Sequence, residues 1–223
     1  MRQENELQRT EDWYKDRIGK VTASGLSDLF SSKLKRESYL MIKTAERYTG
    51  LACSDNGTSY AMMHGVVTEP IAKDYICSFF KRRYPDFNIE DVGFIDHATI
   101  PYCGASPDGI IRFTDKEGIR HKYLLEIKCP QLKGYVNFLV KGEIKTEYKY
   151  QMQLQLMCVP DAEKCLFVNY FDFHHNDSLQ KFKAVLVDRD FDMINSIEQE
   201  INNFNVDVER MLNVIKNNSH IDF

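Results

Sequence analysis

Apolar residues recur at helical spacing through the first third of the chain, from about residue 10 to 83. The pattern predicts three helices, at 22–30, 37–48 and 60–84. Thr22 or Ser24 is expected to cap the first helix, and Gly50 is a plausible left-handed residue after the second. Pro70 is expected to bend the third helix, because a proline inside a helix lacks the N–H that the turn needs.

The spacing changes to short alternating runs in the middle of the chain, which are typical of strands. Four strands are predicted, at 92–95, 100–103, 110–113 and 123–129, with a turn at 114–118 between the last two. Helices at 134–140 and 145–158, strands at 166–173 and 182–187, and a helix at 191–215 follow. This order predicts an α/β or α+β fold with one central mixed β-sheet flanked by helices.

Length and composition narrow the class of protein. The 223 residues fit a single domain, 43% of them are hydrophobic, and the net charge is −4. That charge argues against a passive coat for nucleic acid but not against an enzyme that acts on it. No apolar run is long enough for a membrane span, and the polar start has no secretory signal, so an intracellular protein is expected.

The strongest chemical signal lies in the strands predicted at 110–113 and 123–129. Asp108 opens the first strand, and Glu126 and Lys128 lie two residues apart on the second, so their side chains share one face. A hairpin would place Asp108 beside Glu126. Two carboxylates and the carbonyl of Ile127 are hard oxygen ligands that suit Mg²⁺ or Mn²⁺. An ammonium beside them can orient water, so the set has the equipment for phosphodiester hydrolysis. The competing interpretation is a turn aspartate and a surface ion pair.

Three other motifs carry residues with two interpretations each. Arg17 and Ser24 lie near a helix start and either hold a phosphate or form an ordinary helix junction. Glu69 is either a further metal ligand or an exposed residue before Pro70. The glutamines of 148–155 either position a water or a phosphate, or form a helix edge.

In this order the motifs resemble the bacteriophage lambda exonuclease family, also called YqaJ-like viral recombinases, within the PD-(D/E)xK nuclease superfamily. The resemblance covers about residues 13–187, with the C-terminal helix at about 189–216 outside it. It rests on five motifs: W-Y-x-x-R-x-G-x-x-T-A-S, H-G-x-x-x-E-P, S-P-D-G, L-E-I-K-C-P and Y-x-x-Q-x-Q.

The resemblance implies roles for individual residues. The implied catalytic residues are Asp108, Glu126, Lys128 and Gln151. The implied ligands of two Mg²⁺ ions, or of Mn²⁺ in their place, are Glu69, Asp108, Glu126 and the Ile127 carbonyl. The implied contacts with the 5′-phosphate and the DNA are Arg17, Ser24, Ser106 and Gln153.

It also implies an activity and partners. The expected activity is 5′→3′ degradation of one strand of duplex DNA, with release of 5′-mononucleotides. The 3′ overhang would serve a single-strand annealing protein, and the expected assembly is a homotrimer. Two other functions stay open: an endonuclease or an RNA-acting enzyme like some viral alkaline nucleases, and an inactive nucleic-acid-binding module.

Overall fold

A five-stranded mixed sheet forms the centre of the computed structural model, which describes residues 7–53, 60–173, 176 and 178–218. The strands are ordered β2-β5-β6-β7-β8, with β6 in the middle. β6 is parallel to β7, and the other neighbours are antiparallel. The strands of this sheet are β2 (Asn88–Glu90), β5 (Gly109–Thr114), β6 (Arg120–Lys128), β7 (Lys164–Tyr170) and β8 (Phe182–Val187).

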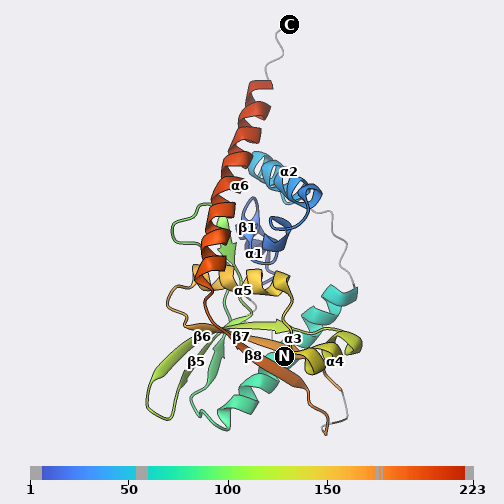
Figure 1. Ribbon diagram of the computed structural model, residues 1–223, viewed down its shortest axis with the longest axis vertical. Helices are drawn as coiled ribbons and strands as arrows, with labels where there is room; N and C mark the ends of the chain where they lie inside the picture. The colour runs from blue at the N-terminus through green and yellow to red at the C-terminus, as the bar shows by residue number, and fades with distance from the viewer. Residues whose placement is uncertain (1–6, 54–59, 174–175, 177, 219–223) are drawn as a thin grey trace.

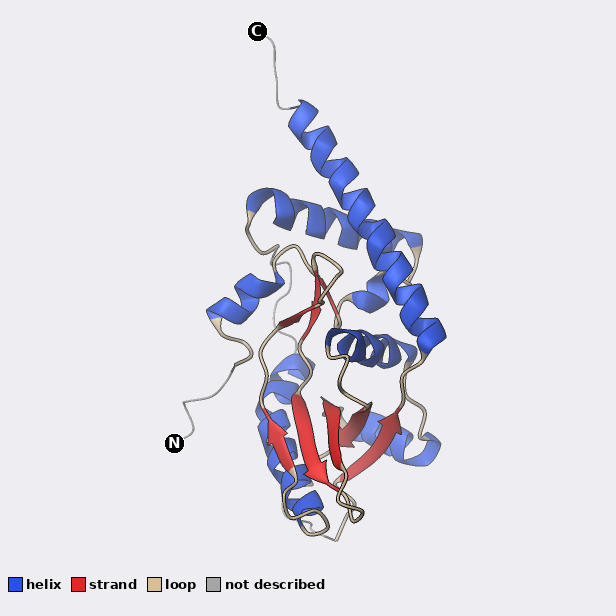
Figure 2. Cartoon of the chain, turned by 90° about the vertical axis from the view of Figure 1, so that its left-hand side faces the viewer, coloured by secondary structure: helices blue, strands red, loops and turns tan. Residues whose placement is uncertain are grey.

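A smaller sheet and the helices complete the described part of the chain (Figures 1 and 2). The smaller sheet has the order β1-β4-β3, made of β1 (Val21–Thr22), β3 (Ile95–Asp96) and β4 (Cys103–Ala105). The helices are α1 (Glu11–Arg17), the short 3₁₀ helix η1 (Leu26–Asp28), α2 (Lys33–Thr49), α3 (Tyr60–Lys81), α4 (Leu132–Lys141), α5 (Thr146–Cys158) and α6 (Phe191–Asn218). None of these helices is both long enough and apolar enough to cross a membrane.

The two faces of the central sheet pack against different helices. Leu125 and Ile127 of β6 belong to a core cluster with Ala72 and Ile76 of α3. Leu124, one residue earlier, belongs to the second cluster, to which α5 and α6 contribute. This alternation confirms the prediction that Glu126 and Lys128 lie on the opposite face from their apolar neighbours.

Helix ends follow the sequence prediction in the second helix and depart from it in the first. Gly50 ends α2 in the left-handed conformation at φ 70°, as expected for a glycine after a helix. Thr22 caps no helix, because it lies in β1, paired with Gly104 of β4. Ser24 makes no cap either: the short helix η1 starts after Gly25, which provides no side-chain cap.

Two further differences concern strands. The strand predicted at 100–103 begins only at Cys103, because residues 97–100 form a turn in which the His97 ring accepts from the backbone N–H of Ile100. β2 was not predicted, since Asn88–Glu90 is short and polar. It forms an edge of the central sheet by pairing with β5.

The long C-terminal helix is held by apolar packing and by arginines of α2, of which Arg47 donates to Asn205 at 2.6 Å. The buried stripe of α6 is Ile197, Ile201, Phe204, Val208 and Leu212. Arg36 of α2 donates to Glu200 at 2.8 Å and to Asp207 at 3.0 Å. Two of the acidic residues of α6 therefore join it to α2. The end of α6 runs beyond the rest of the described structure (Figure 1).

A histidine ties the β5–β6 turn to the loop before β7. His121 lies 3.0 Å from Asp115 through one ring nitrogen and 3.0 Å from Glu163 through the other. Hydrogen bonds to Asp115 and then Glu163 raise the pKa of His121, because both carboxylates favour the charged imidazolium.

Candidate active site

The β5–β6 hairpin brings the two predicted carboxylates together. Gly109 pairs with Leu125, so Asp108 lies opposite Glu126 at the end of the ladder. The Asp108 N–H donates to the Leu125 carbonyl at 2.9 Å, and Asp108 Oδ2 accepts from the Ile127 N–H at 2.6 Å. The aspartate is therefore held by backbone on both sides.

Glu126 is the buried centre of the site. Its side chain is 1% exposed, and its Oε1 lies 2.5 Å from Lys128 Nζ. That contact is an ion pair without hydrogen-bond geometry, since Oε1 receives no hydrogen bond from a described residue. Oε2 accepts from Gln155 Nε2 of α5 at 2.6 Å. A buried carboxylate with one oxygen unsatisfied by hydrogen bonds is costly unless another cation or donor reaches it.

Gln155 is a site residue to which the sequence interpretation gave no role of its own. Gln151, one helical turn earlier, accepts from Lys128 Nζ at 3.1 Å. The spacing i, i+4 puts both glutamines on one face of α5, and this spacing was the available signal. Lys128 Nζ also lies 4.8 Å from the centre of the Tyr148 ring, a cation–π contact.

Gln153 lies on another side of the same helix. It is 2% exposed, its Nε2 donates to the Asp188 carbonyl, and its Oε1 accepts from the Asp190 N–H. Both ends of the amide are therefore used to fix the chain between β8 and α6. The structure gives Gln153 this structural role in place of the predicted DNA contact.

The charges of the site act strongly on one another. The pKa of Asp108 is raised well above its ordinary value by burial and by the nearby charges of Glu126 and Glu69. Burial lowers the pKa of Lys128, but the attraction of Glu126 and Asp108 outweighs it and the pKa is raised. Lys128 is thus an ammonium in this arrangement, suited to donating hydrogen bonds to water or phosphate.

Helix α3 adds the third carboxylate. Glu69 accepts from Arg9 Nη2 at 2.6 Å through Oε2, and its Oε1 lies 3.1 Å from Lys73 Nζ. Lys73 also donates to Asp91 at 3.0 Å. Burial lowers the pKa of Lys73, but Glu69 and Asp91 together raise it. Glu69 therefore lies between two cations.

These residues have the donor set for a divalent cation but do not yet surround one. In the described part of the chain, no three Asp, Glu, His or Cys side chains are arranged as a metal cluster. The fit rests on chemistry: Asp108 and Glu126 are hard oxygen donors, and Glu126 Oε1 is buried without a hydrogen bond. A cation here would also relieve the repulsion that raises the Asp108 pKa.

The residues predicted to hold a phosphate come together beside the small sheet. Arg17 Nη2 donates to Ser24 Oγ at 2.9 Å and to Thr22 Oγ1 at 3.4 Å. Its guanidinium stacks 4.2 Å from the centre of the Trp13 ring, and the indole N–H donates to Ser106 Oγ at 2.9 Å. Burial lowers the pKa of Arg17. Trp13 thus connects Arg17 to Ser106, and all three predicted pocket residues lie in one connected group.

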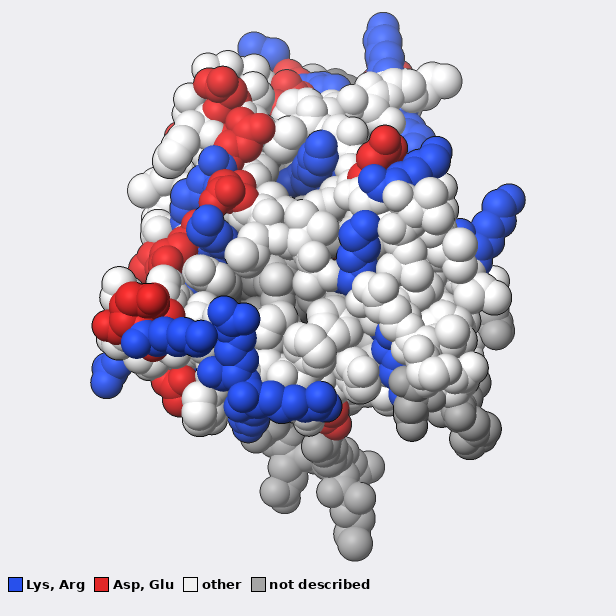
Figure 3. Space-filling model, turned by 60° about the horizontal axis from the view of Figure 1, so that its bottom comes forward, with Lys and Arg blue, Asp and Glu red and all other residues white. Residues whose placement is uncertain are grey.

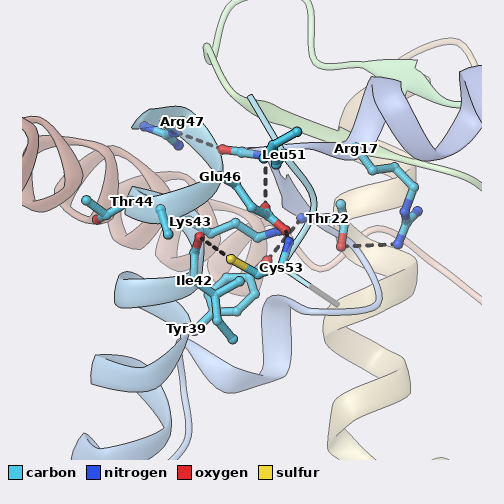
Figure 4. A network of polar contacts seen from close by, with 12 residues as sticks. Arg17, Thr22, Tyr39, Ile42, Lys43, Thr44, Glu46, Arg47, Leu51 and Cys53 are labelled. Atoms are coloured by element: carbon cyan, nitrogen blue, oxygen red, sulfur yellow. Dashed lines mark hydrogen bonds and ion pairs between the residues drawn. The ribbon is translucent and has the colours of Figure 1, made fainter. Parts of the chain in front are cut away.

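A buried ion pair of α2 stabilises the turn that follows Arg17. Glu46 of α2 accepts from the Gly19 N–H at 2.9 Å and from Lys43 Nζ at 2.7 Å (Figure 4). Gly19 has a φ of 71°, which a side chain would strain. A Cβ there would also lie 2.7 Å from Arg47. The turn from α1 into β1, which aims Arg17 at Ser24, is therefore fixed by α2.

Comparisons with known proteins give a family and a fold. A model of the YqaJ-like viral recombinase domain matches residues 12–162. Two crystal structures of the alkaline exonuclease LHK-Exo from Laribacter hongkongensis, one in complex with dAMP, are 31% identical with a TM-score of 0.79. Each alignment covers 94% of this chain and 98% of the other. A phage-related exonuclease from Haemophilus somnus 129PT shares the fold at 11% identity and a TM-score of 0.60, over 88% of this chain and 96% of its own. Curated protein sequences give no match.

These findings confirm two expectations drawn from the sequence. The match to LHK-Exo over nearly the whole of both chains confirms the α/β fold of the PD-(D/E)xK type. The domain model spans all five motifs and ends after the glutamines of α5, so it contains Asp108, Glu126 and Lys128. Motif, fold and family model agree, and this chain belongs to the YqaJ-like viral recombinase family.

Proposed function

We propose that this protein is a metal-dependent exonuclease that degrades one strand of duplex DNA from 5′ to 3′. The observation that carries the proposal is the closeness of the phosphate pocket to the acid pair. Ser106 accepts from Trp13 in the pocket, and Asp108 lies two residues later in the acid pair. Consecutive Cα atoms are about 3.8 Å apart, so an end phosphate at Ser106 lies near the next bond of the same strand.

The chain's own residues have distinct parts in cleavage. Asp108, Glu126 and the Ile127 carbonyl would hold a divalent cation, and Glu69 would be a ligand of a second one in exchange for its contacts with Arg9 and Lys73. Mg²⁺ or Mn²⁺ held there would polarise the phosphate and supply a more acidic water. Lys128, held between Glu126 and Gln151, donates to the attacking water and to the charge that develops on the phosphate. The pocket of Arg17, Ser24 and Ser106 orients the strand, so a 5′-mononucleotide departs and a 3′ overhang remains.

Backbone contacts have to come from local groups, because the whole chain is acidic. The face in Figure 3 shows basic side chains interleaved with acidic ones instead of one uniform basic surface. Four lysines lie after the catalytic strand, at the loops and helices nearest to it: Lys133, Lys141, Lys145 and Lys149. We propose them as the phosphate contacts of the bound duplex, which predicts binding that weakens with salt.

The test is a strand-resolved digestion of a linear duplex in Mg²⁺. One 5′ end carries phosphate and the other a hydroxyl, and a closed circle is digested in parallel. The expected result is release of 5′-mononucleotides from the phosphorylated end alone, with no activity in Lys128→Ala. Calorimetry with DNA and Ca²⁺ shows whether the variant still binds the end. Cleavage inside the circle, or equal cleavage of both ends, contradicts the proposal.

We also propose that the protein assembles as a homotrimer and passes its 3′ overhang to a single-strand annealing protein. An exposed apolar stripe on α4 supports self-association: Leu132, Val136 and Val140 are 50%, 46% and 78% exposed at helical spacing. Light scattering after size exclusion measures the mass directly. A monomeric wild-type protein at micromolar concentration contradicts the trimer, and Val140→Glu is expected to weaken it.

A further inference from the structure

The segment before α1, residues 8–10, lies against both halves of the active site; we call it the N-terminal strap. Gln8 Nε2 donates to the Pro107 carbonyl at 2.7 Å and to the Val92 carbonyl at 3.0 Å. Thr10 caps α1 by accepting from the Trp13 N–H. The strap is therefore fixed at one end to the segment that joins Ser106 to Asp108, and at the other to the helix that carries Arg17.

Arg9, in the middle of the strap, reaches the acid cluster. Its guanidinium donates to Glu69 Oε2 at 2.6 Å, with the arginine side chain 34% exposed and the glutamate 12%. The backbone of Arg9 has a φ of 65°, a conformation that residues other than glycine adopt at a cost. The contacts of Gln8 and Thr10 hold this conformation and keep the guanidinium on Glu69.

Arg9 and a divalent cation compete for the same carboxylate. Both are cations, and Glu69 Oε2 is already occupied by the guanidinium. A cation bound at Glu69 would place a like charge beside Arg9 and would favour exchange of this carboxylate for another anion. The fork of an arginine matches the oxygens of a phosphate, and a phosphate held between the pocket and Asp108 would lie beside the strap.

We propose that Arg9 is a phosphate-contacting residue of the site, which holds Glu69 in the free protein and exchanges that carboxylate for a DNA phosphate when the site is loaded. This inference rests on the proposed function, because it needs both a metal and a DNA strand at the site. It assigns a role to the strap beyond its capping of α1, and it couples metal binding to the arrival of substrate.

The first measurement is metal binding without DNA. Mn²⁺ is titrated calorimetrically into the full chain, into Arg9→Ala and into Arg112→Ala. Arg112 is a matched control, because it also pairs with a glutamate, Glu90, at 3.2 Å, but on the exposed surface of β5. We expect Arg9→Ala to bind Mn²⁺ about tenfold more tightly, the effect of removing one competing charge, with Arg112→Ala unchanged. Adding Glu69→Gln is expected to abolish the gain.

The second measurement is DNA binding. A fluorescent duplex with a 5′-phosphate is titrated in Ca²⁺, with far-UV circular dichroism to show that each variant is folded. We expect Arg9→Ala to bind about tenfold more weakly and Arg9→Lys, which keeps the charge but loses the fork, to lie between. The proposal is overturned if Arg9→Ala fails to gain Mn²⁺ affinity, or if its DNA affinity equals that of the wild type.

These results separate the two proposals. A wild-type protein without nuclease activity on any DNA end refutes the proposed function, whatever the calorimetry shows. An active wild-type protein whose Arg9→Ala variant binds Mn²⁺ and DNA normally refutes only the role of Arg9.

Discussion

Replacing each of two glutamines on α5 with methionine should affect different properties, activity in one variant and stability in the other. Gln155 donates to the buried Glu126, whereas Gln153 holds backbone groups of residues 188 and 190. Methionine has nearly the volume of glutamine and no hydrogen-bonding amide, so packing is largely kept in both variants. The pair is matched in helix, burial and chemical change.

The magnitudes for Gln155→Met nearly cancel in stability. The lost hydrogen bond to a carboxylate costs about 1.5–3 kcal/mol. The same change removes Gln155 Oε1, which is buried without a hydrogen-bond partner and costs about 1–3 kcal/mol as it stands. We therefore expect a net change in the free energy of unfolding within about 1 kcal/mol. Activity should nevertheless fall about 10–100-fold, because a group that orients a metal ligand has an effect of that size.

The expectation for Gln153→Met is the reverse. Its loss leaves one backbone carbonyl and one N–H without their partners, which costs about 2 kcal/mol where water reaches only part of the site. The melting temperature should fall by about 4–8 °C. Cleavage per folded molecule should stay near the wild-type rate, since neither contact faces the acids.

The assay combines thermal unfolding with initial rates on a 5′-phosphorylated duplex, each measured over a range of Mg²⁺. Without Gln155 to orient it, Glu126 should bind Mg²⁺ more weakly. The Mg²⁺ concentration needed for a half-maximal rate should therefore rise in Gln155→Met alone. If both variants lose activity equally, or if Gln155→Met is fully active, the assignment of Gln155 to the site is refuted.

Three further predictions follow from the contacts of single residues. Arg17→Ala should cut cleavage of a 5′-phosphorylated end about 10–100-fold and spare a 5′-hydroxyl end, because a charged hydrogen bond contributes about 1.5–3 kcal/mol; equal losses on both ends would show a structural role. The raised pKa of His121 means that its ion pairs are fully present below about pH 6.5 and are lost as pH rises through the folded pKa. The melting temperature of His121→Gln should thus fall furthest below the wild type near pH 6 and approach it in alkali, and a constant difference would contradict this sign. Arg36→Ala should lower the melting temperature by about 2–4 °C, roughly 1 kcal/mol, through the lost contacts between α2 and α6; its nuclease activity should not change, and a variant as stable as the wild type would show that those contacts contribute nothing.

Features of the structure that local chemistry decides could be predicted from the sequence alone. The hairpin around 114–118, the alternation on β6 and the glycine end of α2 follow from turn residues, period and backbone freedom, and all three are present. The strand spacing placed Asp108, Glu126 and Lys128 in one group, and the family resemblance added Gln151. The structure brings all four together.

Long-range pairing explains what the sequence could not predict. Thr22 looked like a helix cap because nothing nearby in the chain shows that Gly104 pairs with it. Gln153 and Gln155 are alike in sequence, and only the position of α5 over β6 decides which one meets Glu126. The contact of Arg9 with Glu69 spans 60 positions and has no local signal.

The place of β6 in the sheet has a consequence for how the molecule opens. Glu126 and Lys128 lie on the middle strand, which is paired along both edges, whereas Arg9 and Arg17 lie on a short segment and a seven-residue helix at the periphery. Amide protons of β6 are expected to exchange with solvent only when the whole molecule unfolds, and those of residues 8–17 through local fraying at far lower cost. The carboxylates of the acid pair would then stay in place during local opening, and the segments that recognise a strand end would be the ones that open.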